Sequence, residues 1–181
     1  EYERTVRVSV PFAELEDGQV EAVAEAWLLR GVAGVEDGLG YLHALVNEGR
    51  AAGASLPHSH SQLVWLGDEP PAVAAESGDV ERLAARDGLV VAERDGAVAV
   101  VHEAGRAPYE SLILQRDAPL PTVLLLLRDL VRRLRAVEGP VPWNATRRWP
   151  MGRSSGAIRT AVMQGRRITA WGGCRPKRRR R

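Results

Sequence analysis

The sequence is poor in cysteine, in long apolar runs and, over its last 36 residues, in acidic side chains. A single cysteine, Cys174, excludes an internal disulfide and fits a reducing compartment. No apolar run is longer than residues 123–127, whereas a membrane span needs roughly 18 apolar residues. The first residues are charged and contain no apolar signal region. We therefore expect a cytoplasmic protein without a membrane-spanning helix.

Charge is divided unevenly along the chain. Residues 146–181 contain 11 Arg, one Lys and no acidic residue, which gives +12. The other 13 basic residues and all 23 acidic residues come earlier, so residues 1–145 carry −10. Segments this different rarely belong to one evenly built domain. We expect residues 146–181 to be a disordered basic tail or the product of a shifted reading frame; the alternative is a segment that binds a polyanion.

Residues 1–145 alternate between helix and strand patterns. Apolar side chains recur at helical spacing in residues 19–30 and 121–137, and more weakly in residues 73–86. Strand patterns occupy residues 5–12, 41–47, 58–66, 89–92, 98–102, 110–114 and 141–145. The Asp95-Gly96 pair between two of these strands is typical of a hairpin turn. The order of the elements predicts an α+β fold, with an antiparallel-rich sheet and helices packed on it.

Polar side chains gather at the beginning of the predicted strand 58–66. Alternate residues of a strand share a face, so His58, His60 and Gln62 are expected to point the same way. Two imidazoles and a carboxamide are poor core material unless each finds a partner. A neutral imidazole can instead attack phosphorus and form a covalent phosphoramidate. Taken alone, His-x-His is more often the pattern of a metal half-site or of an ordinary polar pair than of a nucleophile.

The loop before this strand, residues 48–57, consists largely of small residues. Glycine and alanine let a ligand approach the backbone, whose N–H groups can hold phosphate oxygens. Ser55 adds a hydroxyl donor, and Asn47 adds a carboxamide at the end of the preceding strand. The loop and the histidines together predict a site that binds and transfers a phosphate-containing group.

The stretch from Asn47 to Gln62 resembles the active-site segment of the galactose-1-phosphate uridylyltransferases, a branch of the histidine-triad superfamily. The pattern of that family is Asn-x-Gly-x-x-x-Gly-x-Ser-x-x-His-Pro-His-x-Gln. Every position matches except the proline, which is Ser59 here. A weaker resemblance covers residues 12–145, including the Pro-aromatic-Glu step at residues 108–110 that begins the second, related half of the family's chain.

The resemblance implies a role for each matching residue. The nucleophile falls on His60, the glutamine that hydrogen-bonds the phosphoryl group on Gln62, and the first histidine of the pair on His58. The contacts to the nucleotide phosphates fall on Asn47, Gly53 and Ser55. We expect His43 to be structural or peripheral and assign His102 no role, and Glu110 remains a candidate for substrate contact.

The resemblance also implies an organisation of the chain, with two departures. Residues 1–103 would be the histidine-triad-like half that carries the active site, residues 104–145 the start of a second related half, and residues 146–181 the basic tail. Some members of the family bind zinc, but the Cys-x-x-Cys pair is missing here, so we predict no metal ligands and no complete zinc site. No histidine follows His102, where the second half would supply another His-x-His. These departures suggest a fragment of the family's usual chain.

The function that the resemblance implies is transfer of a uridylyl group between UDP-glucose and galactose 1-phosphate through a covalent histidine. A glutamine at position 62 cannot deliver a proton, and a sugar phosphate leaves as a stable anion without acid assistance, so transfer is favoured over hydrolysis. A phosphorylase of ADP-sugars or diadenosine polyphosphates is the close alternative, and an inactive fragment that binds polyanions is the alternative of another class. In the family's pattern we expect a homodimer and no nucleic acid partner. Zinc occurs in the family, but we expect no cofactor here because a complete zinc site is not visible in the sequence.

Overall fold

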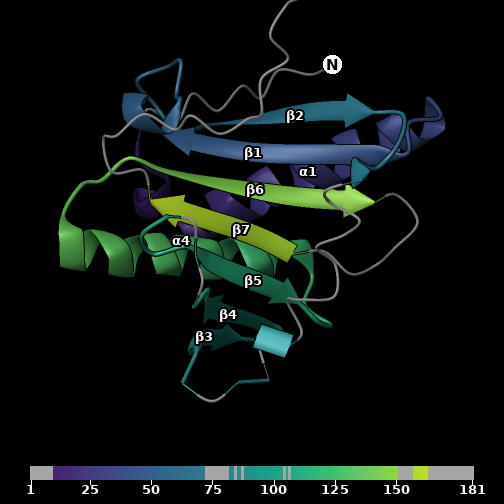
Figure 1. The fold of residues 1–181 in the computed structure, drawn as a ribbon. Helices are drawn as coiled ribbons and strands as arrows, with labels where there is room; N and C mark the ends of the chain where they lie inside the picture. The colour runs from purple at the N-terminus through teal and green to yellow at the C-terminus, as the bar shows by residue number, and fades with distance from the viewer. Residues whose placement is uncertain are drawn as a thin grey trace, which may run out of the picture.

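A single seven-stranded sheet forms the centre of the fold. The computed structural model describes residues 10–71, 82–83, 85–86, 88–103, 105, 107–150 and 157–162. The strands are β1 (Tyr41–Glu48), β2 (His60–Leu66), β3 (Val90–Arg94), β4 (Ala97–Val101), β5 (Ser111–Gln115), β6 (Trp143–Pro150) and β7 (Ala157–Val162). They lie in the order β2-β1-β6-β7-β5-β4-β3, and every neighbouring pair is antiparallel (Figure 1).

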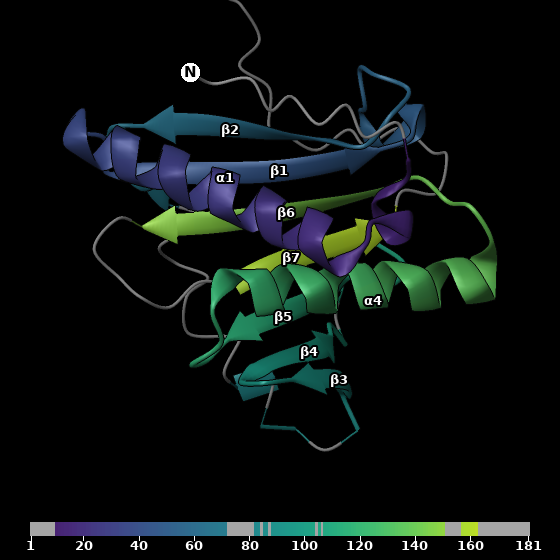
Figure 2. The ribbon, with the colours of Figure 1, turned by 180° about the vertical axis from the view of Figure 1, so that it is seen from behind.

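Two long helices, α1 (Asp17–Glu36) and α4 (Leu120–Glu138), cover one face of this sheet (Figure 2). A short 3-10 turn, η1 (Phe12–Glu14), precedes α1. A second one, η2 (Arg50–Ala52), follows β1. The predicted α+β class, with an antiparallel sheet and packed helices, is confirmed. Among the described residues, no helix is long and apolar enough to cross a membrane.

The main core lies between the sheet and the two helices. Buried apolar side chains of α1 and α4 pack on alternate residues of β1, β4, β5 and β6. The largest of them include Trp27, Leu124, Leu127 and Trp143. A smaller apolar cluster lies elsewhere on β4 and β5, where Val98, Val100, Leu112 and Leu114 pack with Leu83.

Helix α1 is longer than the predicted segment 19–30, because it continues through Gly31 and Gly34. Gly31 and Gly34 are both buried. A Cβ atom on Gly34 would lie 2.2 to 2.5 Å from three ring atoms of Trp65, which belongs to β2. The glycine therefore permits close packing of the helix on the strand and does not break the helix.

The prediction of an unstructured tail from residue 146 is wrong for part of that segment. β6 continues to Pro150 and pairs with β1 along its whole length. β7, at residues 157–162, pairs with both β6 and β5. It thereby joins the strands β2, β1 and β6 to the strands β5, β4 and β3. The many basic residues after position 145 made the segment resemble a charged tail, so its strand pattern was not recognised from the sequence. Arg147 continues the buried series of β6, and its guanidinium donates to Oε1 of Gln115 at 2.6 Å.

Several other predictions can be compared with the described residues. The strands at 41–47 and 110–114, the hairpin from 89 to 102 and the helix at 121–137 are confirmed. The predicted strand 5–12 lies mostly outside the described residues, and its last residue, Phe12, begins η1. Most of the predicted helix 73–86 also lies outside them. The division into related halves at residue 103 stays a prediction.

Two arginines of α4 hold η1 and the start of α1 in place. Arg128 is only 3% exposed; it donates to the carbonyl oxygen of Leu15 at 2.8 Å and pairs with Asp17 at 2.6 Å. Arg132 donates to the carbonyl oxygen of Ala13 at 2.7 Å. The hydrogen bond and the charge from Arg128 lower the pKa of the Asp17 carboxyl. Because these bonds satisfy the carbonyls of Ala13, in η1, and of Leu15, directly after it, they fix this short turn against α4.

Candidate active site

The loop between β1 and β2 is a tight turn stabilised by its own backbone. Gly49 and Gly53 have φ angles of 87° and 88°, a region that only glycine adopts without strain. The N–H groups of Ala52 and Ala54 donate to the carbonyl of Gly49 at 3.0 and 3.2 Å. The N–H group of Gly53 donates to the carbonyl of Arg50 at 3.0 Å. These three N–H groups are therefore already hydrogen-bonded within the loop. Gly53 contributes space for a ligand, because it has no side chain.

Asn47 connects this loop to the strand that precedes it. With its side-chain nitrogen turned toward the loop, Asn47 donates to the carbonyl oxygen of Ala52 at 3.3 Å. The residue is half-buried at the end of β1 and lies directly opposite His60 on β2. Asn47 thus joins the small-residue loop to the histidine, whereas its predicted contact with phosphate stays a prediction. Ser55 lies exposed on the same loop.

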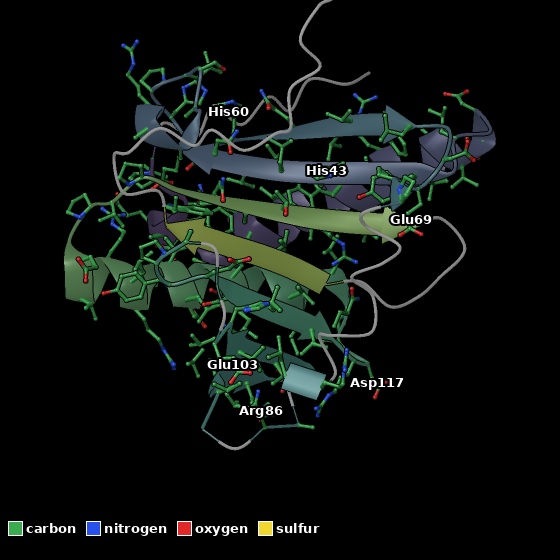
Figure 3. All side chains as sticks on the ribbon, viewed as in Figure 1. His43, His60, Glu69, Arg86, Glu103 and Asp117 are labelled. Atoms are coloured by element: carbon green, nitrogen blue, oxygen red, sulfur yellow. The ribbon has the colours of Figure 1, made fainter. Side chains whose placement is uncertain are left out.

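His60 is the first residue of β2 and lies beside the loop (Figure 3). Its Nδ1 atom is 3.1 Å from the carbonyl oxygen of His58. A carbonyl oxygen can only accept, so this contact favours the tautomer in which Nδ1 carries the proton. The lone pair is then on Nε2. The imidazole is half-buried, and its Nε2 is the atom suited to nucleophilic attack.

The strand alternation places His60 and Gln62 on the face of the sheet opposite the helices. Between them, Ser61 accepts a hydrogen bond from Nε1 of Trp27 on α1, at 3.0 Å, so Ser61 faces the helix layer. Residues 60 and 62 therefore face the other way. Gln62 is exposed and lies opposite Leu45 of β1.

His58 is not on β2, which corrects the prediction that strand alternation aligns it with His60. The strand begins at His60, and residues 55–58 form bends of the loop. The two imidazoles are nevertheless neighbours, with ring centroids 6.1 Å apart and planes inclined by 70°. His58 thus reaches the site from the loop, with its carbonyl bonded to the ring of His60 and its own ring beside that of His60.

Three other candidates lie away from His60. His43 is further along β1, opposite Val64, and its ring is 6.3 Å from that of Tyr41 (Figure 3). Glu110 is buried and precedes β5, and the backbone of His102 is bonded to it. Since β5 is four strands from β2, Glu110 is separated from His60 by about 19 Å at ordinary strand spacing. The described structure therefore does not bring Glu110 into this site.

Three residues near His60 were missed from the sequence. Asn144 of β6 lies directly opposite Asn47, so Asn144, Asn47 and His60 form a row across three strands. The alternation of buried Trp143 and Ala145 around Asn144 was the available signal, but it does not reveal which strand pairs with β6. Glu48 and Ser59 also contact each other beside His60, and the sequence gives no sign of this pair.

The predicted absence of metal ligands can be compared only with the part of the chain that the structure describes. Within these residues, no three His, Cys, Asp or Glu side chains gather as they would around a metal ion. Cys174 lies outside them.

Comparison with solved structures identifies the fold. A GalT-like protein from Arabidopsis thaliana aligns with a TM-score of 0.72 and 20% identity, over 85% of this chain and 61% of its own. The chain has the uridylyltransferase-like fold. A uridylyltransferase aligns with a TM-score of 0.71 and 22% identity, over 86% and 60% of the two chains. An ADP-glucose phosphorylase from Arabidopsis thaliana, solved with bound ADP-glucose, aligns with a TM-score of 0.73 and 18% identity, over 86% and 59%.

The resemblance seen in the sequence is therefore confirmed at the level of the fold. No family model and no curated protein matches the sequence. The chain spans about 60% of the length of the solved chains with the uridylyltransferase-like fold that are named above.

Proposed function

We propose that this chain is a nucleotidyltransferase, similar to the galactose-1-phosphate uridylyltransferases, that uses His60 as a covalent nucleophile. The observation that carries the proposal is the contact between Nδ1 of His60 and the carbonyl of His58, which leaves Nε2 as the basic nitrogen. The joint pattern from Asn47 to Gln62 and the shared fold support it.

The proposed reaction has two displacements at one phosphorus atom. Nε2 of His60 attacks the α-phosphorus of UDP-glucose, an N–P bond forms, and the bond from that phosphorus to the bridging oxygen breaks. Glucose 1-phosphate leaves with the electron pair of the broken bond. A phosphate oxygen of galactose 1-phosphate then attacks the same phosphorus, the N–P bond breaks, and the lone pair returns to Nε2 as UDP-galactose forms.

The neighbouring side chains have roles consistent with these displacements. Gln62, on the same face as His60, would donate a hydrogen bond to a non-bridging phosphoryl oxygen. Its amide does not titrate, so it does little to activate water against the intermediate. The hydroxyl of Ser55 would donate to another phosphate oxygen, and Gly53, which has no side chain, would leave room for the phosphates.

An adenylyl transfer is the second candidate. The alignment with an ADP-glucose phosphorylase, which covers 86% of this chain, favours it. The same His60 chemistry would then take an adenylyl group from an ADP-sugar or a diadenosine polyphosphate and pass it to phosphate. A homodimer and a cytoplasmic location belong to the uridylyltransferase proposal as expectations.

Intact-mass analysis after incubation with UDP-glucose, ADP-glucose or a diadenosine polyphosphate, each in turn, tests the proposal. We expect an acid-labile uridylyl adduct that is absent from His60→Ala. His43→Ala is the matched control, because it removes an imidazole of β1 away from the loop and should keep the adduct. An adenylyl adduct alone would move the assignment to the phosphorylases, and the absence of any adduct in folded protein would refute both.

A further inference from the structure

The residue between the two histidines is tied to distant parts of the chain. The hydroxyl of Ser59 donates to Oε2 of Glu48, at the end of β1. The backbone N–H of Phe12, the first residue of η1, donates to the same carboxylate oxygen at 2.8 Å and to Oγ of Ser59 at 3.0 Å. A hydroxyl, a carboxylate and a backbone N–H thus form a closed triangle, which we call the Ser59 triangle.

The Ser59 triangle is partly shielded from solvent and linked to the core. Phe12 is 3% exposed, while Glu48 and Ser59 are half-buried. The ring of Phe12 packs against Trp143 at a centroid distance of 5.6 Å. A polar group removed from water is costly unless it is hydrogen-bonded, so each member of the triangle depends on the other two.

The Ser59 triangle holds the backbone that carries the hydrogen-bond acceptor of His60. The carbonyl of His58, which contacts Nδ1 of His60 at 3.1 Å, belongs to the peptide that links His58 to Ser59. On the other side of His60, Ser61 is fixed by Nε1 of Trp27 at 3.0 Å. Both serines are therefore anchored, and the imidazole between them projects toward the opposite face.

Serine at this position also calls for an explanation, because the sequence pattern that the loop resembles has proline there. A proline ring fixes the φ angle of its own residue, whereas a serine leaves it free. In this chain, hydrogen bonds from the side chain restrain the backbone in place of the ring. The carboxylate of Glu48 is what makes that restraint available.

We infer that Glu48 and Ser59 are positioning residues for His60, an inference that rests on the proposed function. Through the Ser59 triangle they hold the carbonyl of His58 against Nδ1 of His60, and so keep Nε2 unprotonated and aimed away from the helix layer. They touch neither the nucleotide nor the phosphorus.

The rate of adduct formation from UDP-glucose tests this role. Ser59→Ala and Glu48→Ala should each lower the maximal rate about tenfold, with the half-saturating UDP-glucose concentration changed less than about twofold, because ring orientation is lost while substrate contacts remain. Ser59→Thr keeps the hydroxyl and should recover most of the rate. Ser111→Ala is the matched control, since Ser111 lies on β5, away from His60, and its hydroxyl donates to the carbonyl of Tyr109 at 3.0 Å.

A second readout separates failure of the inference from failure of the proposed function. Two-dimensional ¹H–¹⁵N spectra of the imidazoles of the full chain report the tautomer of His60 without any substrate. We expect the Nδ1–H tautomer in the unaltered protein and in Ser111→Ala, and a mixture of tautomers in Ser59→Ala. If the unaltered protein forms no adduct but Ser59→Ala changes the tautomer, the proposed function fails and the positioning role stands. If Ser59→Ala, folded by circular dichroism, keeps both the tautomer and the rate, the positioning role is refuted.

Discussion

Replacement of Gly34 by alanine tests the packing that seats β2, the strand of His60, on helix α1. The added Cβ would lie 2.2, 2.4 and 2.5 Å from three ring atoms of Trp65, whereas carbon atoms in contact are about 3.5 to 4.0 Å apart. The ring or the helix must therefore move by more than about 1 Å, relative to that spacing. Overpacking of this kind costs about 1 to 3 kcal/mol in the free energy of unfolding.

Alanine also favours the helix over glycine, by about 1 kcal/mol, and a control must remove this contribution. Gly18→Ala supplies it, because Gly18 is on the same helix and no atom lies within 4 Å of its added Cβ. We expect Gly34→Ala to be less stable than Gly18→Ala by about 2 kcal/mol, which corresponds to about 4 to 8 °C in the melting temperature of a chain of this size.

Urea unfolding followed by circular dichroism measures this difference. Repeating both substitutions in a Trp65→Leu background completes a double-mutant cycle, in which the penalty at Gly34 should largely disappear because the ring is gone. Equal stability of Gly34→Ala and Gly18→Ala, or an unchanged penalty in the Trp65→Leu background, would refute the packing explanation.

Three further predictions follow from the contacts. The folded pKa of Asp17 is lowered by Arg128, so the stability that this contact contributes is present above the unfolded pKa of 3.8 and is lost as the pH falls through the folded pKa; acid titration of Arg128→Met should lack that loss. The pKa of Tyr109 is raised by its hydrogen bond to Glu138. The midpoint of its absorbance titration should therefore lie at a higher pH in the unaltered protein than in Glu138→Gln. Gly53→Ala, at a φ of 88°, should lower stability by about 1 to 2 kcal/mol and slow adduct formation; unchanged values in urea unfolding and mass analysis would contradict the loop's role.

Elements with a strong local pattern could be predicted from the sequence. The helix at 121–137 has apolar residues at helical spacing, and its buried residues include Val123, Leu127 and Val131. The hairpin of β3 and β4 has its Asp95-Gly96 turn, with φ angles of 40° and 84° at the two residues. Such signals lie within one element and need no knowledge of its neighbours.

The missed parts of the fold depend on contacts between distant segments. Helix α1 continues through Gly34, where Trp65 packs against it, whereas a glycine in the sequence alone suggests a break. β7 pairs with β5 and β6, but its basic surroundings have the composition of a tail. Arg147 is buried where Gln115 of β5 accepts a hydrogen bond from its guanidinium. No local sequence pattern indicates this contact.

The candidate site shows the same division. The spacing of small residues, histidines and glutamine predicted a stretch of the chain in which the structure brings Asn47, His58 and His60 together. The start of β2 at His60 was not visible, because Ser59 and His60 both suit a strand. The alignment of Asn144 with Asn47 and the contact between Glu48 and Ser59 arise only when β1 pairs with both β2 and β6.

The measurement that tests the central claim most directly is localisation of the covalent group, followed by its transfer. The protein is incubated with UDP-glucose, freed of excess donor and digested at neutral pH, and the modified peptide is sequenced by mass spectrometry; a parallel sample receives galactose 1-phosphate first. We predict a uridylyl group on His60 alone, and its complete removal by galactose 1-phosphate with formation of UDP-galactose. Folded protein without a modified histidine, or with the group on His58 or His43, would contradict the assignment of His60 as the nucleophile.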